Sequence, residues 1–250
     1  MHPQRIISLV PSQTELLFDL GVEDRLVGLT KFCIHPADKV KLKTVVGGTK
    51  TLHMDRIHAL RPDLILANKE ENTREEIEEL QRLYPVHVTD ITTLEDALAM
   101  IRTVGGLVGA SEKANGLAEV LAADFRKLSV AAAETAPRVA YFIWRKPWMA
   151  AAADTFIDHL LRAAGFRNAF AGQSRYPELT EADIRAARPD AVFLSSEPYP
   201  FGEKHRAELR ALCPEAEILL VDGELFSWYG SRLRHSVAYF QELRHRLGLP

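Results

Sequence analysis

The chain has 250 residues, of which 47% are hydrophobic and 26% are charged, with a formal net charge of −3. This composition is typical of a globular protein with enough apolar material for one large domain or two small ones, and the slightly negative charge excludes a strongly basic nucleic-acid-binding protein. The two cysteines form no CxxC pair, which argues against a structural zinc site, and no apolar run reaches the roughly 18 residues that a membrane span requires.

The first half of the chain alternates short apolar runs with amphipathic segments. The run RIISLV at 5–10 is β-branched and predicts a buried strand. Two Ser/Thr-x-x-Glu patterns, at 12–15 and 73–76, resemble capping boxes and predict helices over 14–20 and from 73 to about 83. The other elements expected in this half are strands over 25–29, 44–46, 64–67 and 86–88, and helices over 55–60 and 94–104. We expect Gly105, Gly106 and Gly109 to break the chain after these elements.

The stretch 111–136 (SEKANGLAEVLAADFRKLSVAAAETA) lacks proline and carries apolar residues at spacings of three and four. This period predicts one long helix, roughly 37 Å in length at 1.5 Å per residue.

The second half repeats the alternation of strands and helices. An apolar run at 138–144 (RVAYFIW) predicts a strand, and Asp154 and Thr180 are placed to cap helices over 155–164 and 180–187. The remaining elements expected here are strands over 191–195 and 218–221, and helices over 204–212 and 232–247.

A short internal repeat links the two halves. The segment 57–67 (IHALRPDLILA) matches 184–194 (IRAARPDAVFL) at a constant offset of 127 residues. Helix, Arg-Pro-Asp and buried strand follow one another in both copies, which favours a duplicated α/β unit. We therefore predict an α/β fold with two Rossmann-like lobes, at 1–110 and 137–250, joined by a backbone helix at 111–136. One continuous doubly wound sheet is the alternative.

The loops that follow the expected strands carry aromatic and basic side chains. Ligands of α/β sheets bind outside the carboxyl ends of the strands, and a planar, partly polar ligand between two lobes would need aromatic walls and a few hydrogen-bond donors. The candidate ligand-binding residues on these loops are Phe32, Cys33, His35, Asn68, Lys69, Trp144, Arg145, Trp148, Arg175, Tyr176, Trp228, Tyr229 and Arg232.

Each candidate also has a plainer interpretation. Cys33 and His35 could ligate a metal, but two ligands do not complete a site, and a semi-buried thiol beside a surface imidazole explains them equally. The basic residues could bind carboxylate or phosphate groups of a ligand, or could be scattered surface charge. Trp144 could belong to the core at a strand end.

Three segments carry a family resemblance: RIISLVPSQTELLFDLG at the start, MDRIHALRPDLILA, and the long mid-chain helix. They resemble the substrate-binding proteins of ABC importers that carry cobalamin, ferric siderophores and haem, and are most similar to the cobalamin-binding members. The resemblance runs over nearly the whole chain. It implies two lobes joined by one helix, a ligand in the cleft between them, no intrinsic cofactor, and no catalysis.

Some residues can be compared with the family one by one. Phe32 and Tyr176 stand where the cobalamin-binding members place cleft aromatics, and Trp148 lies near another such position. Thr49 and Asn68 stand where those members have tryptophans, so this chain departs from the corrinoid pattern there. The bound ligand that the resemblance implies is cobalamin or another metal complex.

The resemblance also implies a docking surface for a membrane permease. Each lobe of these proteins presents a carboxylate to arginines of the permease. Asp55 matches the first, and Glu181 or Asp183 lies at the second. All three are expected in first turns of helices, where an acidic residue is also favourable for electrostatic reasons alone.

No ATP-binding, dinucleotide-binding or hydrolase motif occurs in the chain. The main hypothesis is a non-catalytic binding protein that delivers a corrinoid or another metal chelate to an ABC importer, in the periplasm by resemblance. No signal-peptide pattern precedes the first expected strand, so we expect either a mature chain that begins with an added Met or a cytoplasmic protein. The alternative hypothesis is the cytoplasmic protein on the same scaffold, either an enzyme or a carrier of a smaller anionic ligand.

Overall fold

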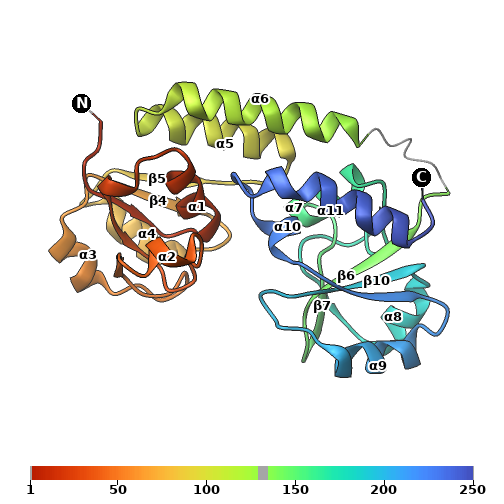
Figure 1. Ribbon diagram of the computed structural model, residues 1–250. Coiled ribbons are helices and arrows are strands. Elements are labelled where there is room, and N and C mark those ends of the chain that lie inside the picture. The colour runs from red at the N-terminus through yellow and green to blue at the C-terminus, as the bar shows by residue number, and fades with distance from the viewer. Residues whose placement is uncertain (1, 129–134, 250) are drawn as a thin grey trace. The chain divides into compact units, whose positions relative to one another are not determined.

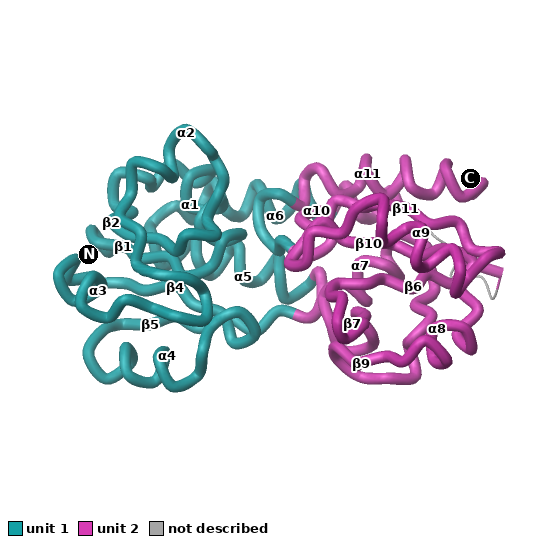
Figure 2. Tube along the Cα trace, turned by 90° about the horizontal axis from the view of Figure 1, so that it is seen from below, with its two compact units in different colours: residues 1–91, 95–122, 228–232 teal, residues 92–94, 123–227, 233–250 magenta. Residues whose placement is uncertain are grey.

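The computed structural model describes residues 2–128 and 135–249 (Figure 1). The chain divides into two compact units (Figure 2). Unit 1 comprises Met1–Ile91, Glu95–Ala122 and Trp228–Arg232, and unit 2 comprises Thr92–Leu94, Ala123–Ser227 and Leu233–Pro250. The five residues Trp228–Arg232 thus belong to unit 1, although the chain on either side of them belongs to unit 2.

Unit 1 is built on a five-stranded sheet in the order β3-β2-β1-β4-β5, with every neighbouring pair parallel. Its strands are β1 (Ile6–Ser8), β2 (Leu26–Leu29), β3 (Thr44–Val45), β4 (Leu64–Asn68) and β5 (Val86–Thr89). Its helices are α1 (Pro11–Asp19), η1 (Glu23–Arg25), α2 (Ala37–Val40), α3 (Met54–Leu60), α4 (Arg74–Gln81), α5 (Leu94–Leu107) and the first part of α6 (Ser111–Lys127). Ile7 and Ile65 of the central strands lie in one buried cluster with Ile57 of α3 and Leu80 of α4, which holds these helices against the sheet.

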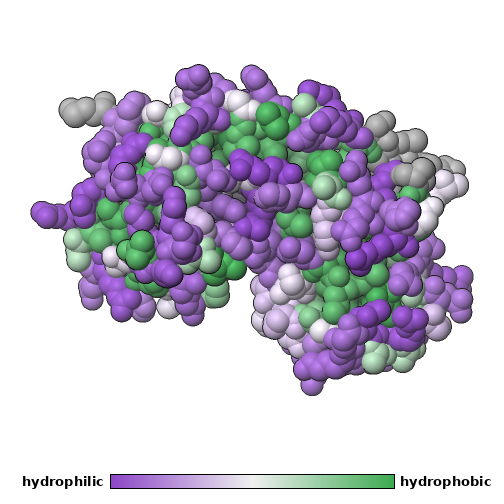
Figure 3. All heavy atoms as spheres, viewed as in Figure 1, coloured by the Kyte–Doolittle hydropathy of each residue, from purple (hydrophilic) through white to green (hydrophobic). Residues whose placement is uncertain are grey.

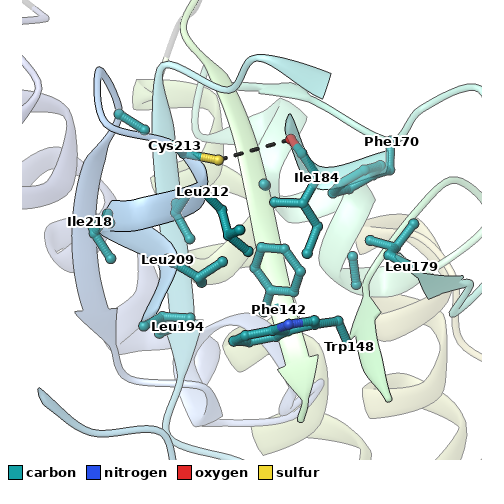
Figure 4. Close-up of a cluster of buried hydrophobic side chains, with 14 of the residues drawn as sticks. Phe142, Trp148, Phe170, Leu179, Ile184, Leu194, Leu209, Leu212, Cys213 and Ile218 are labelled. Atoms are coloured by element: carbon teal, nitrogen blue, oxygen red, sulfur yellow. Dashed lines mark hydrogen bonds between the residues drawn. The ribbon is translucent and has the colours of Figure 1, made fainter. Parts of the chain in front are cut away.

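Unit 2 is built on a mixed six-stranded sheet in the order β11-β10-β6-β7-β9, with β8 pairing β6. Its strands are β6 (Arg138–Trp144), β7 (Trp148–Ala150), β8 (Arg167–Asn168), β9 (Glu178–Leu179), β10 (Ala191–Ser195) and β11 (Glu217–Val221). Its helices are α7 (Phe156–Ala163), α8 (Glu181–Ala187), α9 (Glu203–Leu212), α10 (Glu224–Ser227) and α11 (Leu233–Arg246). Figure 4 shows part of its core, in which Phe142 of β6 and Trp148 of β7 pack among aliphatic side chains from α8, α9, β10 and β11.

The internal repeat has a structural counterpart in both units. Arg61 after α3 and Arg188 after α8 adopt nearly the same left-handed conformation, with φ of 44° and 42°. Asp63 then accepts a hydrogen bond from the backbone N–H of Arg5 at the start of the first strand of unit 1, and Asp190 accepts one from the N–H of Arg138 at the start of β6. The Arg-Pro-Asp sequence therefore ends a helix and ties the next strand to its neighbour in each unit.

The long helix is shorter than predicted. α6 ends at Lys127, and residues 129–134 of the expected helix lie outside the described residues, while Thr135 and Ala136 are not helical. The Leu128 N–H bonds to the Phe125 carbonyl three residues back, which tightens the last turn. Arg126 and Lys127 in that turn complement the negative end of the helix dipole.

Gly105 and Gly106 do not break the chain, contrary to the prediction, but lie inside α5. A Cβ on Gly105 would come within 2.1 Å of the Ala114 Cβ of α6. The glycine therefore allows two consecutive helices to pack closely, which outweighs its poor helix propensity.

The two predicted capping boxes in unit 1 are also wrong. α1 begins at Pro11, which suits the first helical position because its φ is preset and its missing N–H would have no partner there. α4 does begin after Thr73, but the Thr73 hydroxyl donates to the Lys50 carbonyl and Glu76 accepts from the Leu52 N–H. Both side chains hold a neighbouring loop instead of capping the helix.

On the face shown in Figure 3, hydrophilic residues dominate, and hydrophobic residues show through in separate patches. Among the residues that the structure describes, no helix is both long and apolar enough to cross a membrane.

Candidate functional site

The carboxyl edge of the sheet in unit 1 has a topological switch point between β1 and β4. From β1 the chain continues through α1 to β2 on one side, whereas β4 lies on the other side of β1 and leads to β5. Open α/β sheets bind ligands at such points because neighbouring loops diverge there. The first residues beyond the two strands therefore decide whether unit 1 has space for a ligand at this edge.

Asn68 at the end of β4 is used for structure. Its amide nitrogen donates to Thr89, and its carbonyl oxygen accepts from the backbone N–H groups of Glu70 and Glu71 at 2.8 and 3.1 Å. Asn72 accepts from the Asn68 N–H at 2.8 Å and donates to backbone carbonyls on two other loops. Asn68 is buried and shapes the loop after β4, and its predicted role in ligand binding stays a prediction.

Three further candidates, Trp228, Tyr229 and Arg232, lie together on the segment Trp228–Arg232, which packs on unit 1. The Tyr229 hydroxyl donates to the Glu71 carboxylate at 2.9 Å. Burial, reinforced by the Glu71 charge, raises the pKa of Tyr229 well above its usual value. The Arg232 guanidinium meets the Glu15 carboxylate through two hydrogen bonds of 2.9 and 2.7 Å.

The same segment makes close ring and backbone contacts. Arg232 lies over the Trp228 ring at 5.0 Å, and the His35 ring meets Trp228 edge-on at a centroid distance of 5.4 Å. A Cβ on Gly230 would lie 2.7 Å from the Ser12 carbonyl oxygen in the first turn of α1. Trp228 and Tyr229 are buried by these contacts, so this segment closes the edge beside α1 with side chains that already have partners.

The loop after β2 presents the exposed aromatic of unit 1. Phe32 is 50% exposed, and the Lys31 ammonium lies 5.0 Å from its ring. Ile34 on the same loop is also exposed; the sequence analysis did not single it out, although an apolar residue between Cys33 and His35 was visible there. Lys69, after β4, is exposed and pairs with Asp90.

Cys33 points away from solvent on that loop. Its sulfur lies 3.1 Å from the Thr14 hydroxyl and 3.3 Å from the Thr30 hydroxyl. Burial raises the pKa of the Cys33 thiol, against the smaller opposing effect of these two hydrogen bonds. A metal ligand must be a thiolate, so this geometry favours the plainer interpretation of Cys33 as a buried thiol.

In unit 2 the exposed aromatic candidate is Trp144, at the carboxyl end of β6. Its side chain is 40% exposed, and its ring meets Tyr199 edge-on at 5.5 Å and 69°. Tyr199 lies on the loop after β10, so two neighbouring parallel strands bring these residues together. The sequence analysis noted this loop but did not name Tyr199; the alternating Pro198-Tyr-Pro-Phe201 was the available signal.

The other tryptophan of this unit is a core residue. Trp148 is buried, meets Phe142 edge-on at 5.3 Å and stacks on Phe201. Arg145 lies over its ring at 4.3 Å and pairs with Glu208 at 2.8 Å. Trp148 and Arg145 therefore support the surface around Trp144, because the tryptophan is covered by its neighbours and the guanidinium is paired.

Arg175 and Tyr176 come from the loop before β9. Arg175 has a left-handed backbone with φ of 63°, and its guanidinium donates to the Asp154 carbonyl and lies 5.7 Å from the Tyr176 ring. Arg175 is exposed and Tyr176 is half-buried. This pair gives unit 2 a second exposed cation beside an aromatic ring.

The three predicted docking carboxylates all lie in first turns of helices, as expected. Asp55 is exposed at the start of α3. Glu181 pairs with Arg185 one turn later. Asp183 accepts from the hydroxyl and the N–H of Thr180, and these hydrogen bonds lower the pKa of its carboxyl. All three carboxylates are exposed, and Asp183 also caps α8.

A cavity of about 640 Å³ lies in unit 2 between α7 and β8. It is lined by charged residues such as Arg138, Asp158 and Arg162, and by none of the candidate ligand-binding residues. Across residues 2–128 and 135–249 no group of three or more His, Cys, Asp or Glu side chains could hold a metal ion. The candidate surfaces are therefore the exposed rings and cations at the strand ends.

The family model described as periplasmic binding protein matches residues 6–210. The chain belongs to the periplasmic binding protein family. Members of this family bind solutes and do not catalyse reactions, which confirms the expectation of a non-enzyme, and a solute that such a protein carries is cargo and not a cofactor.

Relatives of this binding protein are known from several bacteria. It is 27% identical over 202 residues to the uncharacterized ABC transporter substrate-binding lipoprotein YvrC of Bacillus subtilis, a match that covers 76% of this chain and 63% of YvrC. It is 28% identical over 200 residues to the vitamin B12-binding protein of Pectobacterium atrosepticum, covering 77% and 71% of the two chains. YvrC is named as a lipoprotein and the matching family model describes periplasmic binding proteins, which supports a location outside the cytoplasm.

Solved structures share the fold over almost the full chain. The periplasmic heme-binding protein BhuT, in complex with two hemes, is 26% identical with a TM-score of 0.85, and the match covers 99% of this chain and 100% of BhuT. The vitamin B12-binding protein BtuF of Vibrio cholerae is 22% identical with a TM-score of 0.84, covering 98% of each chain. The predicted α/β fold, with two sheet-based lobes of the helical-backbone class, is confirmed.

Proposed function

We propose that this chain is the substrate-binding protein of an ABC importer and that its cargo is a planar metal chelate of the corrinoid or heme class. Several of its relatives are named as vitamin B12-binding proteins, and BhuT is described as a heme-binding protein. The structural observation that carries the proposal is the exposed Trp144 ring at the end of β6. A large ring left in water at a strand end has apolar area available for a conjugated ligand.

Phe32 supplies the corresponding ring in unit 1. It lies on the loop after the parallel strand β2, is half exposed, and has a lysine beside it. A macrocycle with carboxylate or amide side groups fits such a surface, because the ring face contacts the conjugated system and the nearby cation meets the polar edge. Corrinoids and hemes share this chemistry.

Titration of the purified protein with a panel of chelates tests the proposal. Hemin, dicyanocobinamide, cyanocobalamin and ferrichrome differ in ring type and charge, and each has an absorbance band that reports binding. We expect at least one macrocycle to bind with a dissociation constant near 1 µM, about −8 kcal/mol. Dissociation constants above about 100 µM for all four, weaker than about −5.5 kcal/mol, would refute the assignment of the cargo.

A matched set of variants locates the binding surface. Trp144→Ala removes the exposed part of a large ring, on the order of 80–100 Å² of contact, which at about 25 cal/mol per Å² corresponds to roughly 2 kcal/mol or about 30-fold in affinity. Phe32→Ala is expected to weaken binding by a similar factor, roughly 30-fold, because the exposed area of the two rings is about the same. Leu83→Ala is the control, because Leu83 is more exposed than either ring but follows α4 at the opposite edge of the sheet. Equal losses in all three variants would contradict the placement.

For the importer partner, we propose that Asp55 and Glu181 contact basic groups of the permease. Both are exposed, and both lie in first turns of helices whose C-terminal ends have the same geometry. The Glu181–Arg185 pair is exposed and therefore weak, so it does not prevent another partner from binding. The double variant Asp55→Lys/Glu181→Lys should keep its ligand affinity and lose stimulation of the importer's ATPase activity. Unchanged stimulation would exclude this surface.

A further inference from the structure

A buried histidine stands behind the exposed tryptophan of unit 2. His205, in the first turn of α9, is enclosed by the rings of Tyr199 and Phe201 at centroid distances of 5.3 and 5.2 Å. Its Nδ1 lies 3.0 Å from the backbone nitrogen of Gly202, and its Nε2 lies 3.1 Å from the Tyr199 hydroxyl oxygen. Both ring nitrogens are therefore engaged, and the imidazole has no freedom to turn.

The backbone contact determines which nitrogen carries the proton. An amide N–H can only donate, so Nδ1 must accept the hydrogen bond from Gly202. The neutral imidazole then has its hydrogen on Nε2, which donates to the Tyr199 oxygen. Consequently the phenol accepts in this pair, and its own proton is not used by His205.

Tyr199 lies beside the exposed ring of Trp144 and still has its own hydroxyl proton to donate. Tyr199 is half-buried and meets the exposed Trp144 ring edge-on at 5.5 Å. Within the described part of the chain, His205 is the hydrogen-bond partner of the hydroxyl. Tyr199 thus lies beside the most exposed large ring in unit 2 with its hydroxyl held by His205, and a half-buried donor without an acceptor is costly once a ligand excludes water.

We propose that Tyr199 is a specificity-determining residue that donates a hydrogen bond to a carboxylate or carboxamide oxygen on the periphery of a macrocycle lying on Trp144, and that His205 positions it. This inference rests on the proposed function. It narrows the cargo to chelates with acceptor groups on the rim of the ring. A macrocycle with only alkyl substituents cannot accept this hydrogen bond, so it leaves the phenol proton unpaired and binds without the contribution of Tyr199.

The Tyr199→Phe variant removes the donor and keeps the ring, with Tyr239→Phe as the matched control. The Tyr239 hydroxyl also accepts from an N–H, that of Asp222 at 2.8 Å, but it lies on α11 among Phe226 and Phe240. Hemin and dicyanocobinamide serve as probes with rim acceptors, and iron etioporphyrin as a probe without them. We expect Tyr199→Phe to weaken binding of the acceptor-bearing probe by about tenfold or more, and to leave etioporphyrin binding unchanged. Tyr239→Phe should change neither.

The role of His205 is tested with His205→Asn, which can still accept from the Gly202 N–H but lacks the Nε2 donor. It should weaken binding of the acceptor-bearing probe less than Tyr199→Phe does, by roughly threefold. The ¹⁵N spectrum of the wild-type imidazole should show the Nε2-protonated form, a signal that a purely structural histidine need not give. The Nδ1-protonated form would overturn the assignment of the donor.

The possible outcomes separate this inference from the proposed function. If the wild type binds hemin or dicyanocobinamide and Tyr199→Phe binds it within twofold as tightly, the inference fails and the proposed function stands. An equal loss for etioporphyrin also overturns the inference, because the phenol would then act through packing. If the wild type binds neither acceptor-bearing probe, the proposed cargo fails and the role of Tyr199 fails with it.

Discussion

The ion pair between Arg232 and Glu15 should hold the segment Trp228–Arg232 on unit 1. The two side chains are only 14% and 16% exposed, and two hydrogen bonds join them. Replacing Arg232 by alanine leaves the Glu15 carboxylate largely buried without its partner and removes the cation from the Trp228 ring. We therefore expect Arg232→Ala to lower the free energy of unfolding substantially.

The magnitude follows from the burial of the pair. Breaking a fully buried ion pair costs about 3–5 kcal/mol, whereas an exposed pair contributes about 0–1 kcal/mol. A pair that keeps a small contact with water lies between these limits, so we expect a loss of roughly 2 kcal/mol. For a chain of this length that corresponds to a fall in melting temperature of about 4–8 °C.

A double-mutant cycle isolates the pair from the rest of the segment. Urea denaturation of the wild type, Arg232→Ala, Glu15→Gln and the double variant gives the coupling free energy, which we expect to be about 1–2 kcal/mol. Tryptophan fluorescence reports on Trp228 in the same experiment. A loss below about 0.5 kcal/mol for Arg232→Ala, together with a coupling near zero, would refute the argument that this pair holds the segment.

Three further predictions concern other parts of the chain. Gly105→Ala should destabilise the protein by about 1–3 kcal/mol in urea denaturation, because the new Cβ would meet Ala114 at 2.1 Å. Gly106→Ala is the control: it has open space around it and should stabilise the protein by up to about 1 kcal/mol. Equal effects of the two substitutions would contradict the close packing of α5 and α6. Cys33 should react with a thiol reagent in the native protein at least about 100-fold more slowly than in urea, because burial raises its pKa and little thiolate forms; rapid labelling of the native thiol would show that the loop opens. The Asp183 carboxyl has a lowered pKa in the folded protein, so its contribution to stability is present above the unfolded pKa near 3.8 and is lost as the pH falls through the folded pKa. Asp183→Asn keeps the hydrogen-bond acceptor but does not titrate, so we expect its urea midpoint to shift less between pH 6 and pH 3 than that of the wild type. An identical shift would place the acid sensitivity elsewhere.

Local patterns in the sequence predicted most elements well. The strand at Arg138–Trp144 and the helix that begins after Thr180 have the expected bounds, because a β-branched apolar run and a capping threonine act within a few residues of chain. The capping boxes at 12–15 and 73–76 failed for the opposite reason. Proline took the first helical position in one, and a loop from elsewhere in the chain took the hydrogen bonds of the other.

The candidate site depends even more strongly on contacts between distant parts of the chain, which local sequence patterns do not predict. Sequence patterns placed Phe32, Trp144 and Trp228 at strand ends or on loops, but they could not distinguish an exposed ring from one covered by a distant segment. Trp228 is covered because the segment around it packs on unit 1, and Trp148 because Phe142 and Phe201 enclose it. Burial of this kind depends on tertiary contacts, which leave no mark on the spacing of residues. The predicted role of each of these residues in ligand binding therefore stays a prediction, with Phe32 and Trp144 favoured by exposure.

The packing of the segment Trp228–Arg232 on unit 1 affects where this unit can contact a ligand. The switch point between β1 and β4 is the usual binding place in an open parallel sheet, yet here Tyr229 is hydrogen-bonded to Glu71 beside it and Gly230 lies against Ser12. The close approach at Gly230 requires a residue without a side chain, so the segment cannot shift without losing several contacts at once. We therefore expect a ligand to contact unit 1 at the loop after β2, where Phe32 is exposed, and not at the switch point, where Trp228 and Tyr229 are buried.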